Sequence, residues 1–321
     1  MSTHDTLGRR HRERPQSTGK RVTAQPRDLL WFQKLQEHGP LSSRFLHAFS
    51  HHLCRNEKRA RDRLTDLFNE TETPHGGLYL TRPWQQFETL DARYQELVYD
   101  LGPAAQTALD ELGTCYGNHA SAGGPWRHRA MVAAIAASIE LATLHCQSVK
   151  FIPQHAILTR AQTGLRCQVP FVNPATGKEE RHDLIPDALF GLEYRSGKQS
   201  SFRFFVVEAD RGTEPTRTGS FSRKSHLRHF LQYREYVAGG LYRGHLKLTA
   251  PLLVLNVTAD RATMTGMMKL AAELSPGGMT YQCFQSVPQF GRFFKPARPL
   301  PSLLQQAWER PGHPLVRIDR P

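Results

Sequence analysis

Two short segments about twenty residues apart place acidic side chains among strand-forming apolar residues. The first, Ile185–Phe190, contains Asp187, and the second, Phe204–Arg211, contains Glu208 and Asp210. A charge in such surroundings is costly unless something binds it. Carboxylate oxygens at the ends of neighbouring strands are ligands for hard divalent cations, so the pattern predicts a site for Mg²⁺ or Mn²⁺. An ion there would polarise a phosphodiester and activate a water molecule, which is the chemistry of a metal-dependent hydrolase.

The spacing of these acids predicts how they are arranged. Asp187 is expected at the start of one central strand and Glu208 at the end of the next. Glu208 and Asp210 are two residues apart, so they should point to the same face of a strand. Glu140, on a long helix predicted earlier in the chain, could reach the same pocket. The alternative is that the acids lie in turns and pair with local arginines such as Arg211.

The helix predicted over residues 220–237 supplies the remaining candidate catalytic groups. Lys224 would orient the attacking water or stabilise charge on phosphorus. Gln232 and Tyr236 are four residues apart, so they share a helix face and would hold the DNA strand near the cut. The alternative is an ordinary amphipathic helix, in which Tyr233 belongs to the core and Lys224 is solvated.

Composition limits the class of protein. The chain has 321 residues, enough for two domains, and a formal net charge of +13, which favours a polyanion such as nucleic acid as partner. No apolar run is long enough for a membrane span, and the polar, basic start does not look like a secretory signal. The five scattered cysteines form no CxxC pair, which fits a reducing cytoplasm.

Several familiar chemistries are not signalled. The chain has no HExxH, no Walker-type phosphate loop and no nucleophile elbow. We therefore expect His226 and His229 to be exposed polar residues and not ligands.

The first part of the chain predicts a DNA-binding unit. Residues 1–26 read as a disordered basic arm, and residues 27–118 as three short helices, a short strand over 78–82 and a linker. This is the order of a winged helix-turn-helix. The third helix, about residues 56–69, has a basic outer face that would enter the major groove. The predicted DNA contacts are Lys58, Arg59, Arg61, Arg63 and Arg82. The alternatives are a merely solvated face or a protein-docking module.

The rest of the chain predicts an α/β domain with a central mixed sheet, over residues 119–295. A long helix over 127–147 precedes four strands and a helix, and the apolar run 252–257 reads as a buried parallel strand before a further helix and strand. The four strands are expected at about residues 151–158, 165–172, 183–194 and 201–209. Residues 296–321 read as an irregular Pro-rich tail. The fold class is therefore α/β, or α+β overall.

Two family resemblances follow from these residues. Pro186-Asp187, then Glu208-Ala209-Asp210, then Gln232 and Tyr236, over about residues 127–260, resembles the PD-(D/E)xK nuclease superfamily. That resemblance implies a restriction-endonuclease-like fold and Mg²⁺-dependent phosphodiester cleavage. The chain departs from the pattern at Asp210, where the motif has lysine. Lys224 would have to supply the amine from the helix, and otherwise the fold would be kept without activity.

Over about residues 27–290 the chain also resembles the replication-relaxation family of plasmids and other mobile elements. The matching features are Arg27–Leu30, Gly77–Thr81, Pro186-Asp187 and, above all, Val207–Glu214. The resemblance implies plasmid or mobile-element DNA as partner, along with other replication or mobilisation proteins. It also implies a bacterial cytoplasmic location at the nucleoid or plasmid. A homodimer is left open.

Three functional hypotheses result. The first is a two-domain Mg²⁺-dependent DNA nickase or endonuclease, with Asp187, Glu208 and Asp210 as metal ligands. The second is a non-catalytic DNA-binding replication or transcription factor with a degenerate nuclease-like scaffold. The third is a DNA-relaxing transesterase that uses Tyr233 or Tyr236 as nucleophile.

Overall fold

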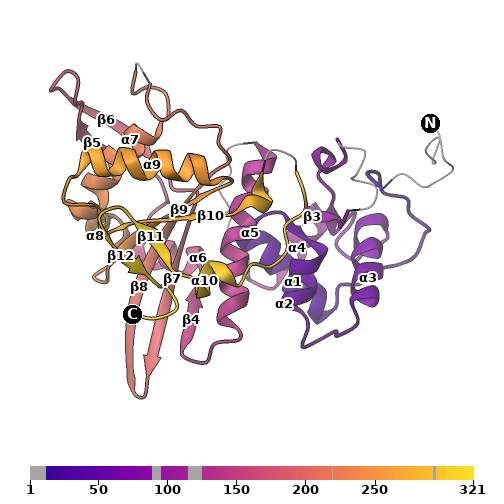
Figure 1. Ribbon diagram of the computed structural model, residues 1–321. Helices are drawn as coiled ribbons and strands as arrows, with labels where there is room; N and C mark the ends of the chain where they lie inside the picture. Colours follow the sequence, from indigo (N-terminus) through magenta and orange to yellow (C-terminus); the bar gives the residue numbers. More distant parts are fainter. Residues whose placement is uncertain (1–11, 89–94, 115–124, 219, 292–293) are drawn as a thin grey trace. The chain divides into compact units, whose positions relative to one another are not determined.

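The computed structural model describes residues 12–88, 95–114, 125–218, 220–291 and 294–321 (Figure 1). The protein is a mixed α+β protein with two compact units. Unit 1 comprises Met1–Ala137 with Phe294–Pro299, and unit 2 comprises Ser138–Phe293 with Leu300–Pro321. The division falls inside helix α5 (Trp126–Thr143). The boundary expected at residues 118–119 lies outside the described residues.

Unit 1 combines helices with a small antiparallel sheet whose strand order is β1-β3-β2. Its elements are α1 (Pro26–His38), β1 (Leu41–Ser42), α2 (Ser43–Phe49), α3 (Glu57–Asn69), β2 (Leu80–Thr81), the 3₁₀ turn η1 (Trp84–Phe87), β3 (Val98–Leu101) and α4 (Pro103–Glu111). Strand β3 lies in the centre, where Tyr99 pairs with Leu41 and Leu101 pairs with Leu80.

Helix α3 shows why these segments fold as they do. The Asn56 side chain caps the helix by accepting a hydrogen bond from the Arg59 backbone N–H. Ala60, Leu64 and Leu67 recur at helical spacing and are fully buried, as the sequence pattern predicts. This apolar stripe fixes which face of α3 is turned away from the core.

The described part of the N-terminal segment has tertiary contacts. Residues 12–25 form no helix or strand, but they lie along the end of α3. Ser17 Oγ donates to Glu70 Oε2 at 2.7 Å, and the Val22 backbone N–H donates to the Glu72 carbonyl at 2.9 Å. Residues 12–25 of the expected disordered arm are thus an irregular segment held in place. Arg9 and Arg10, which we expected in that arm, lie outside the described residues.

Unit 2 is built on a seven-stranded mixed sheet with the order β12-β11-β10-β9-β8-β7-β4. The strands are β4 (Val149–Ile152), β7 (Ala188–Ser196), β8 (Gln199–Asp210), β9 (Leu252–Thr258), β10 (Gln282–Ser286), β11 (Trp308–Arg310) and β12 (His313–Val316). The central strands β8, β9 and β10 are parallel, and the outer pairs are antiparallel. Val206 and Val254 are fully buried in this centre, so the run 252–257 is the buried parallel strand that was predicted.

Helices and a separate β-hairpin complete unit 2. They are α6 (Gln154–Ala161), β5 (Cys167–Val172), β6 (Glu179–Leu184), α7 (His226–Tyr233), the π-helical turn η3 (Arg234–Ala238), α8 (Leu241–Leu246), α9 (Arg261–Leu274), η4 (Pro288–Phe290) and α10 (Ser302–Gln305). Figure 1 shows the β5–β6 hairpin beside α7, and α7 packs on the sheet through Phe230, whose ring contacts Phe284 of β10.

The structure corrects three expectations for unit 2. The strand expected over 183–194 is two strands, since β6 ends at Leu184 and β7 begins at Ala188. The strand expected over 151–158 ends at Ile152, because Pro153 precedes helix α6. Residues 300–321 of the expected irregular tail instead form α10, β11 and β12, with Trp308 fully buried. Such short elements carry too little periodicity to be recognised among prolines. None of the helices in the described residues combines the length and the apolar character that a membrane span requires.

Candidate functional site

The structure brings the two acidic segments together in unit 2. Asp187 precedes β7, which pairs antiparallel with β8 so that Ala188 lies opposite Val207. The Asp187 backbone N–H donates to the Val207 carbonyl at 3.1 Å, and the Ala209 N–H donates to Asp187 Oδ2 at 2.8 Å. Asp187 is therefore held beside the part of β8 that carries Glu208.

Glu208 faces helix α7. Tyr233 of α7 donates a hydrogen bond from its hydroxyl to Glu208 Oε1. Burial, and then the negative charge of Asp187, raise the pKa of Glu208 well above its ordinary value, against the opposing effects of the Tyr233 hydrogen bond and the Lys224 charge. At Glu208 the protein thus maintains an ionisable group whose charged form is poorly stabilised.

Asp210 faces the same helix, as expected from its two-residue offset, and is fully engaged. Its Oδ2 lies 2.9 Å from His226 Nε2, and its Oδ1 accepts hydrogen bonds from the N–H groups of Gly212 and Thr213 at 2.9 and 3.1 Å. Burial opposes ionisation, but these hydrogen bonds and the His226 charge lower the pKa of Asp210 on balance. His226 is 3% exposed, and its Nδ1 has no hydrogen-bond partner among the described residues. Asp210 therefore orients a buried imidazole.

His229 and Glu214 also lie close to Glu208 or to each other. His229 Nδ1 lies 3.9 Å from Glu208 Oε2 and 3.8 Å from Glu214 Oε2. Burial lowers the pKa of His229 to about 3, so the ring is neutral at pH 7. Burial, and then the charge of Asp210, raise the pKa of Glu214. We call Asp187, Glu208, Asp210, Glu214, His226, His229 and Tyr233 the acid–histidine cluster.

Lys224 lies in the loop before α7 and not on the helix. It is exposed, and the next residue, Ser225, caps α7 by accepting from the Arg228 N–H. The Lys224 charge lowers the pKa of both Glu208 and Glu214. It therefore acts on the cluster through its charge from an exposed position.

Three candidate residues are not brought to the cluster. Gln232 donates from Nε2 to the His182 carbonyl at 3.0 Å, on the β6 side of α7. The Tyr236 hydroxyl lies 2.7 Å from His245 Nδ1 of α8. Glu140 is buried on α5 and is not among the charges that most affect Glu208.

The cluster contains residues that the sequence analysis missed. His226 and His229, expected to be exposed, are buried or nearly so, because they share with Tyr233 the α7 face that covers the end of β8. Their signal was present as the three- and four-residue spacing of His226, His229 and Tyr233 on one helix face. Glu214 has no such spacing, although it ends the run Val207–Glu214 that carries the family resemblance, and only the folded loop places it near β8.

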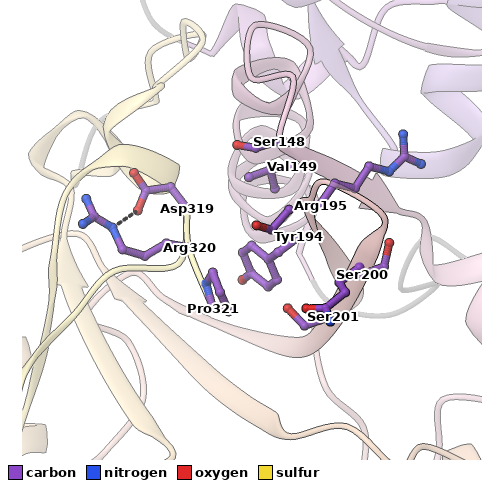
Figure 2. A pocket seen from close by; sticks show the side chains of 11 residues that line it. Ser148, Val149, Tyr194, Arg195, Ser200, Ser201, Asp319, Arg320 and Pro321 are labelled. Atoms are coloured by element: carbon purple, nitrogen blue, oxygen red, sulfur yellow. Dashed lines mark hydrogen bonds and ion pairs between the residues drawn. The ribbon is translucent and has the colours of Figure 1, made fainter.

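A separate pocket of about 580 Å³ lies at the opposite end of the β7–β8 hairpin (Figure 2). Its lining includes Tyr194, Arg195 and Arg320, but no residue of the acid–histidine cluster. Arg195 already donates a hydrogen bond to Glu193, and Arg320 donates one to Asp319. The candidate chemistry of unit 2 therefore lies at the cluster.

In unit 1, the five predicted DNA contacts fall into two groups. Lys58, Arg59 and Arg61 are exposed on α3. Arg63 instead forms an ion pair with the fully buried Asp28 at 2.6 Å. Arg82 is buried, with its guanidinium 3.9 Å from the ring centroid of Phe68. The first three side chains are available to a partner, and the last two belong to the core of unit 1.

The fold and sites define a two-unit α+β protein with an exposed basic helix in unit 1 and a buried acid–histidine cluster in unit 2. In a comparison with protein families, the chain matches the replication-relaxation family over residues 32–251. Since this match covers more than half of the chain, the protein belongs to the replication-relaxation family. Comparison with curated proteins found no match, and comparison with solved structures found none either.

Family membership points to a role in the replication or relaxation of mobile elements, with DNA or replication proteins as partners. The matched residues include helix α3 and the whole acid–histidine cluster, and they end just before β9.

Proposed function

We propose that this protein is a DNA-binding protein of a plasmid or other mobile element, and that unit 1 is its winged helix-turn-helix. The observation that carries the proposal is the order α1-β1-α2-α3-β2-β3 combined with the sheet order β1-β3-β2. Winged helices have this arrangement, and their third helix enters the major groove.

The exposed face of α3 has the chemistry that this role needs. Lys58, Arg59 and Arg61 are exposed, whereas Ala60 and Leu64 on the opposite face are fully buried. Arginine and lysine bind phosphate oxygens and the acceptor groups of guanine. A chain with a net charge of +13 adds a general attraction to the phosphate backbone.

The test of this proposal is the salt dependence of duplex binding. Fluorescence anisotropy with a labelled duplex should show that Lys58→Ala, Arg59→Ala and Arg61→Ala together weaken binding. The slope of log K against log salt should fall by roughly 3 if each side chain contacts one phosphate. The control removes the same charge from exposed lysines of unit 2, through Lys178→Ala, Lys198→Ala and Lys269→Ala. Equal affinity losses in both triple variants would contradict the assignment of α3.

For unit 2 we propose metal-dependent cleavage of a DNA phosphodiester. Glu208 supports this proposal. Its burial beside Asp187 raises its pKa, so its negative charge is poorly stabilised, and a bound cation would offset that charge. The antiparallel pair β7–β8, the helix α7 and the parallel strand β9 also agree with a PD-(D/E)xK-like arrangement.

The carboxylate and imidazole donors of the cluster suit a divalent cation, although in this structure they are too far apart to bind one ion together. In the described part of unit 2, no three of the cluster's acid and histidine donors all lie within 4.8 Å of one another. Asp187, Glu208 and Glu214 would hold the ion after side-chain rotation, since both oxygens of Asp210 are already engaged. The ion would supply a polarised phosphodiester and an activated water.

The protein's own groups have distinct parts in this proposal. Tyr233 holds Glu208 by its hydrogen bond, and the neutral His229 ring lies beside Glu208 without adding charge. Asp210 orients His226, and Lys224 would stabilise negative charge on the phosphate from its exposed position.

The test uses supercoiled plasmid with Mg²⁺, Mn²⁺ or EDTA. Metal-dependent nicked or linear product, lost in Glu208→Gln, is the expected result, because glutamine keeps an acceptor for Tyr233 but removes the charge. Exposed Glu273, which pairs with Arg217 at 2.7 Å, supplies the matched control Glu273→Gln. Intact plasmid under all conditions, together with normal duplex binding, would favour the non-catalytic DNA-binding alternative.

A further inference from the structure

Trp84 is an exposed aromatic side chain in the 3₁₀ turn η1, which follows strand β2 of unit 1. The side chains of Trp31 and Trp308 are 0% exposed and that of Trp126 is 9% exposed, whereas Trp84 is 64% exposed. Indole rings are usually buried for most of their area, since leaving them in water forfeits a large hydrophobic stabilisation. Trp84 is therefore a candidate for contact with a partner.

The backbone on both sides of Trp84 is fixed. On one side, Arg82 lies over the rings of Phe68 and Tyr99, with its guanidinium carbon 3.9 and 5.1 Å from their centroids. On the other side, the Gln86 side chain donates to the Val98 carbonyl and accepts from the Val98 N–H, both at 2.9 Å. The 3₁₀ turn η1 thus presents Trp84 from a rigid support, which lowers the entropy lost when the ring is covered.

This support adjoins the DNA-facing side of α3. Arg82 Nη2 donates to Thr65 Oγ1 at 3.4 Å, and Thr65 Oγ1 donates to the Arg61 carbonyl one turn earlier. Arg61 and Thr65 are four residues apart and share one helix face. A ligand lying along the exposed cations of α3 would therefore pass Arg82, two residues before Trp84.

We propose that Trp84 stacks on an unpaired DNA base that lies next to the duplex bound by α3. This inference rests on the proposed DNA binding by unit 1. In a duplex both faces of a base are already covered by neighbouring base pairs. An exposed, rigidly held indole can therefore stack only on a base with a free face, such as an unpaired base. The preferred ligand is accordingly a junction between duplex and single strand.

The experiment compares two oligonucleotide hairpins with the same duplex, one blunt and one with a single-stranded tail. Trp84→Ala should weaken binding of the tailed hairpin by about 5- to 150-fold, which is the effect of losing one stacked base, and should leave the blunt hairpin nearly unchanged. Trp84→Phe should restore part of the affinity, because phenylalanine keeps an aromatic face. Leu112→Ala, which trims an exposed apolar side chain of the same unit, is the matched control.

Intrinsic fluorescence gives an independent readout, because Trp84 is the one largely exposed tryptophan among the four. The tailed hairpin should quench the emission of the wild-type protein more than the blunt hairpin does, and Trp84→Phe should abolish this difference. Unchanged emission, or equal affinity losses for both hairpins, would overturn the proposal, and the latter would indicate another role for Trp84. Duplex affinity that the triple α3 variant leaves unchanged would instead contradict the proposed function.

Discussion

Arg63 and Arg61 lie two residues apart on α3, and the structure predicts opposite consequences for their removal. Arg63 donates to Asp28 Oδ2 from Nε at 3.0 Å and from Nη2 at 2.6 Å, and its Nη2 also donates to the Thr23 carbonyl. Asp28 is fully buried, and the Arg63 side chain is 13% exposed. Arg61, by contrast, is exposed.

Arg63→Ala should therefore destabilise unit 1 strongly. Removing one partner of a buried ion pair costs about 3–5 kcal/mol, because the other charge is left buried without compensation. Asp28 keeps two weaker contacts, a hydrogen bond from the Gln25 N–H at 2.9 Å and Arg27 Nε at 3.6 Å. We therefore expect the lower end of that range, about 3 kcal/mol. Arg61→Ala should change stability by less than about 0.5 kcal/mol, as exposed substitutions usually do.

Urea unfolding of the two variants, followed by circular dichroism and tryptophan fluorescence, measures these differences, and anisotropy with a duplex measures DNA affinity. Arg61→Ala should lower affinity at unchanged stability. Arg63→Ala should lower stability and, under conditions where it is folded, bind DNA with near wild-type affinity. An Arg63→Ala protein of normal stability with a DNA defect equal to that of Arg61→Ala would refute the assignment of Arg63 to the core.

The acid–histidine cluster yields three further predictions. Burial and the charge of Asp187 raise the pKa of Glu208, so the folded state should lose stability as pH rises above the ordinary pKa of glutamate. Glu208→Gln should remove this loss of stability. Melting temperatures measured between about pH 4.5 and 8 test this prediction. Asp210→Asn should cost about 1.5–3 kcal/mol in urea unfolding at pH 7. Because the pKa of Asp210 is lowered, this penalty should shrink as pH falls through that depressed value. Mg²⁺ or Mn²⁺ at 100 times its dissociation constant should stabilise the protein by about 2.7 kcal/mol in the same unfolding assay, and Asp187→Asn should abolish that gain.

Each of these predictions has an outcome that would contradict it. Parallel pH profiles for the wild type and Glu208→Gln would mean that Glu208 ionises without penalty. If Asp210→Asn left the free energy of unfolding unchanged, the contact with His226 would add nothing to stability. Equal stabilisation of the wild type and Asp187→Asn by the metal would place the ion elsewhere.

The sequence contained the parts of the fold whose signal is local and strong. The run 252–257 is apolar at every position but Asn256, and α3 repeats apolar residues at helical spacing, so both were predictable. The proximity of Asp187 and Glu208 followed from the expectation of neighbouring strands, and the ladder between β7 and β8 confirms that pairing.

Other features depend on which face of an element is covered, and local patterns do not contain this information. The helical segment α7–η3 has polar groups on several faces. Only its packing on β8 selects Tyr233 of α7 over Tyr236 of η3 as the residue that meets Glu208. Arg82 appears in the sequence as one more surface cation, but two aromatic rings from α3 and β3 enclose it. Burial of a cation between rings is a tertiary effect that charge patterns do not reveal.

The residue two positions after Glu208 determines what the acid–histidine cluster needs. The proposed nuclease-like motif would have a lysine there, but the chain has Asp210, whose own charge is held by His226 and two backbone N–H groups. The neutral His229 adds no charge, and Lys224 acts only from an exposed position.

Glu208 must therefore gain a proton or a cation to be well stabilised, and this requirement connects the catalytic and non-catalytic hypotheses. In a metal-dependent nuclease, a divalent ion would displace the proton of Glu208, so metal affinity would rise with pH across the raised pKa of that residue. In a DNA-binding scaffold the proton would remain, and metal would leave the pH dependence of stability unchanged. The pH dependence of metal binding thus separates the two hypotheses even when the DNA site is not known.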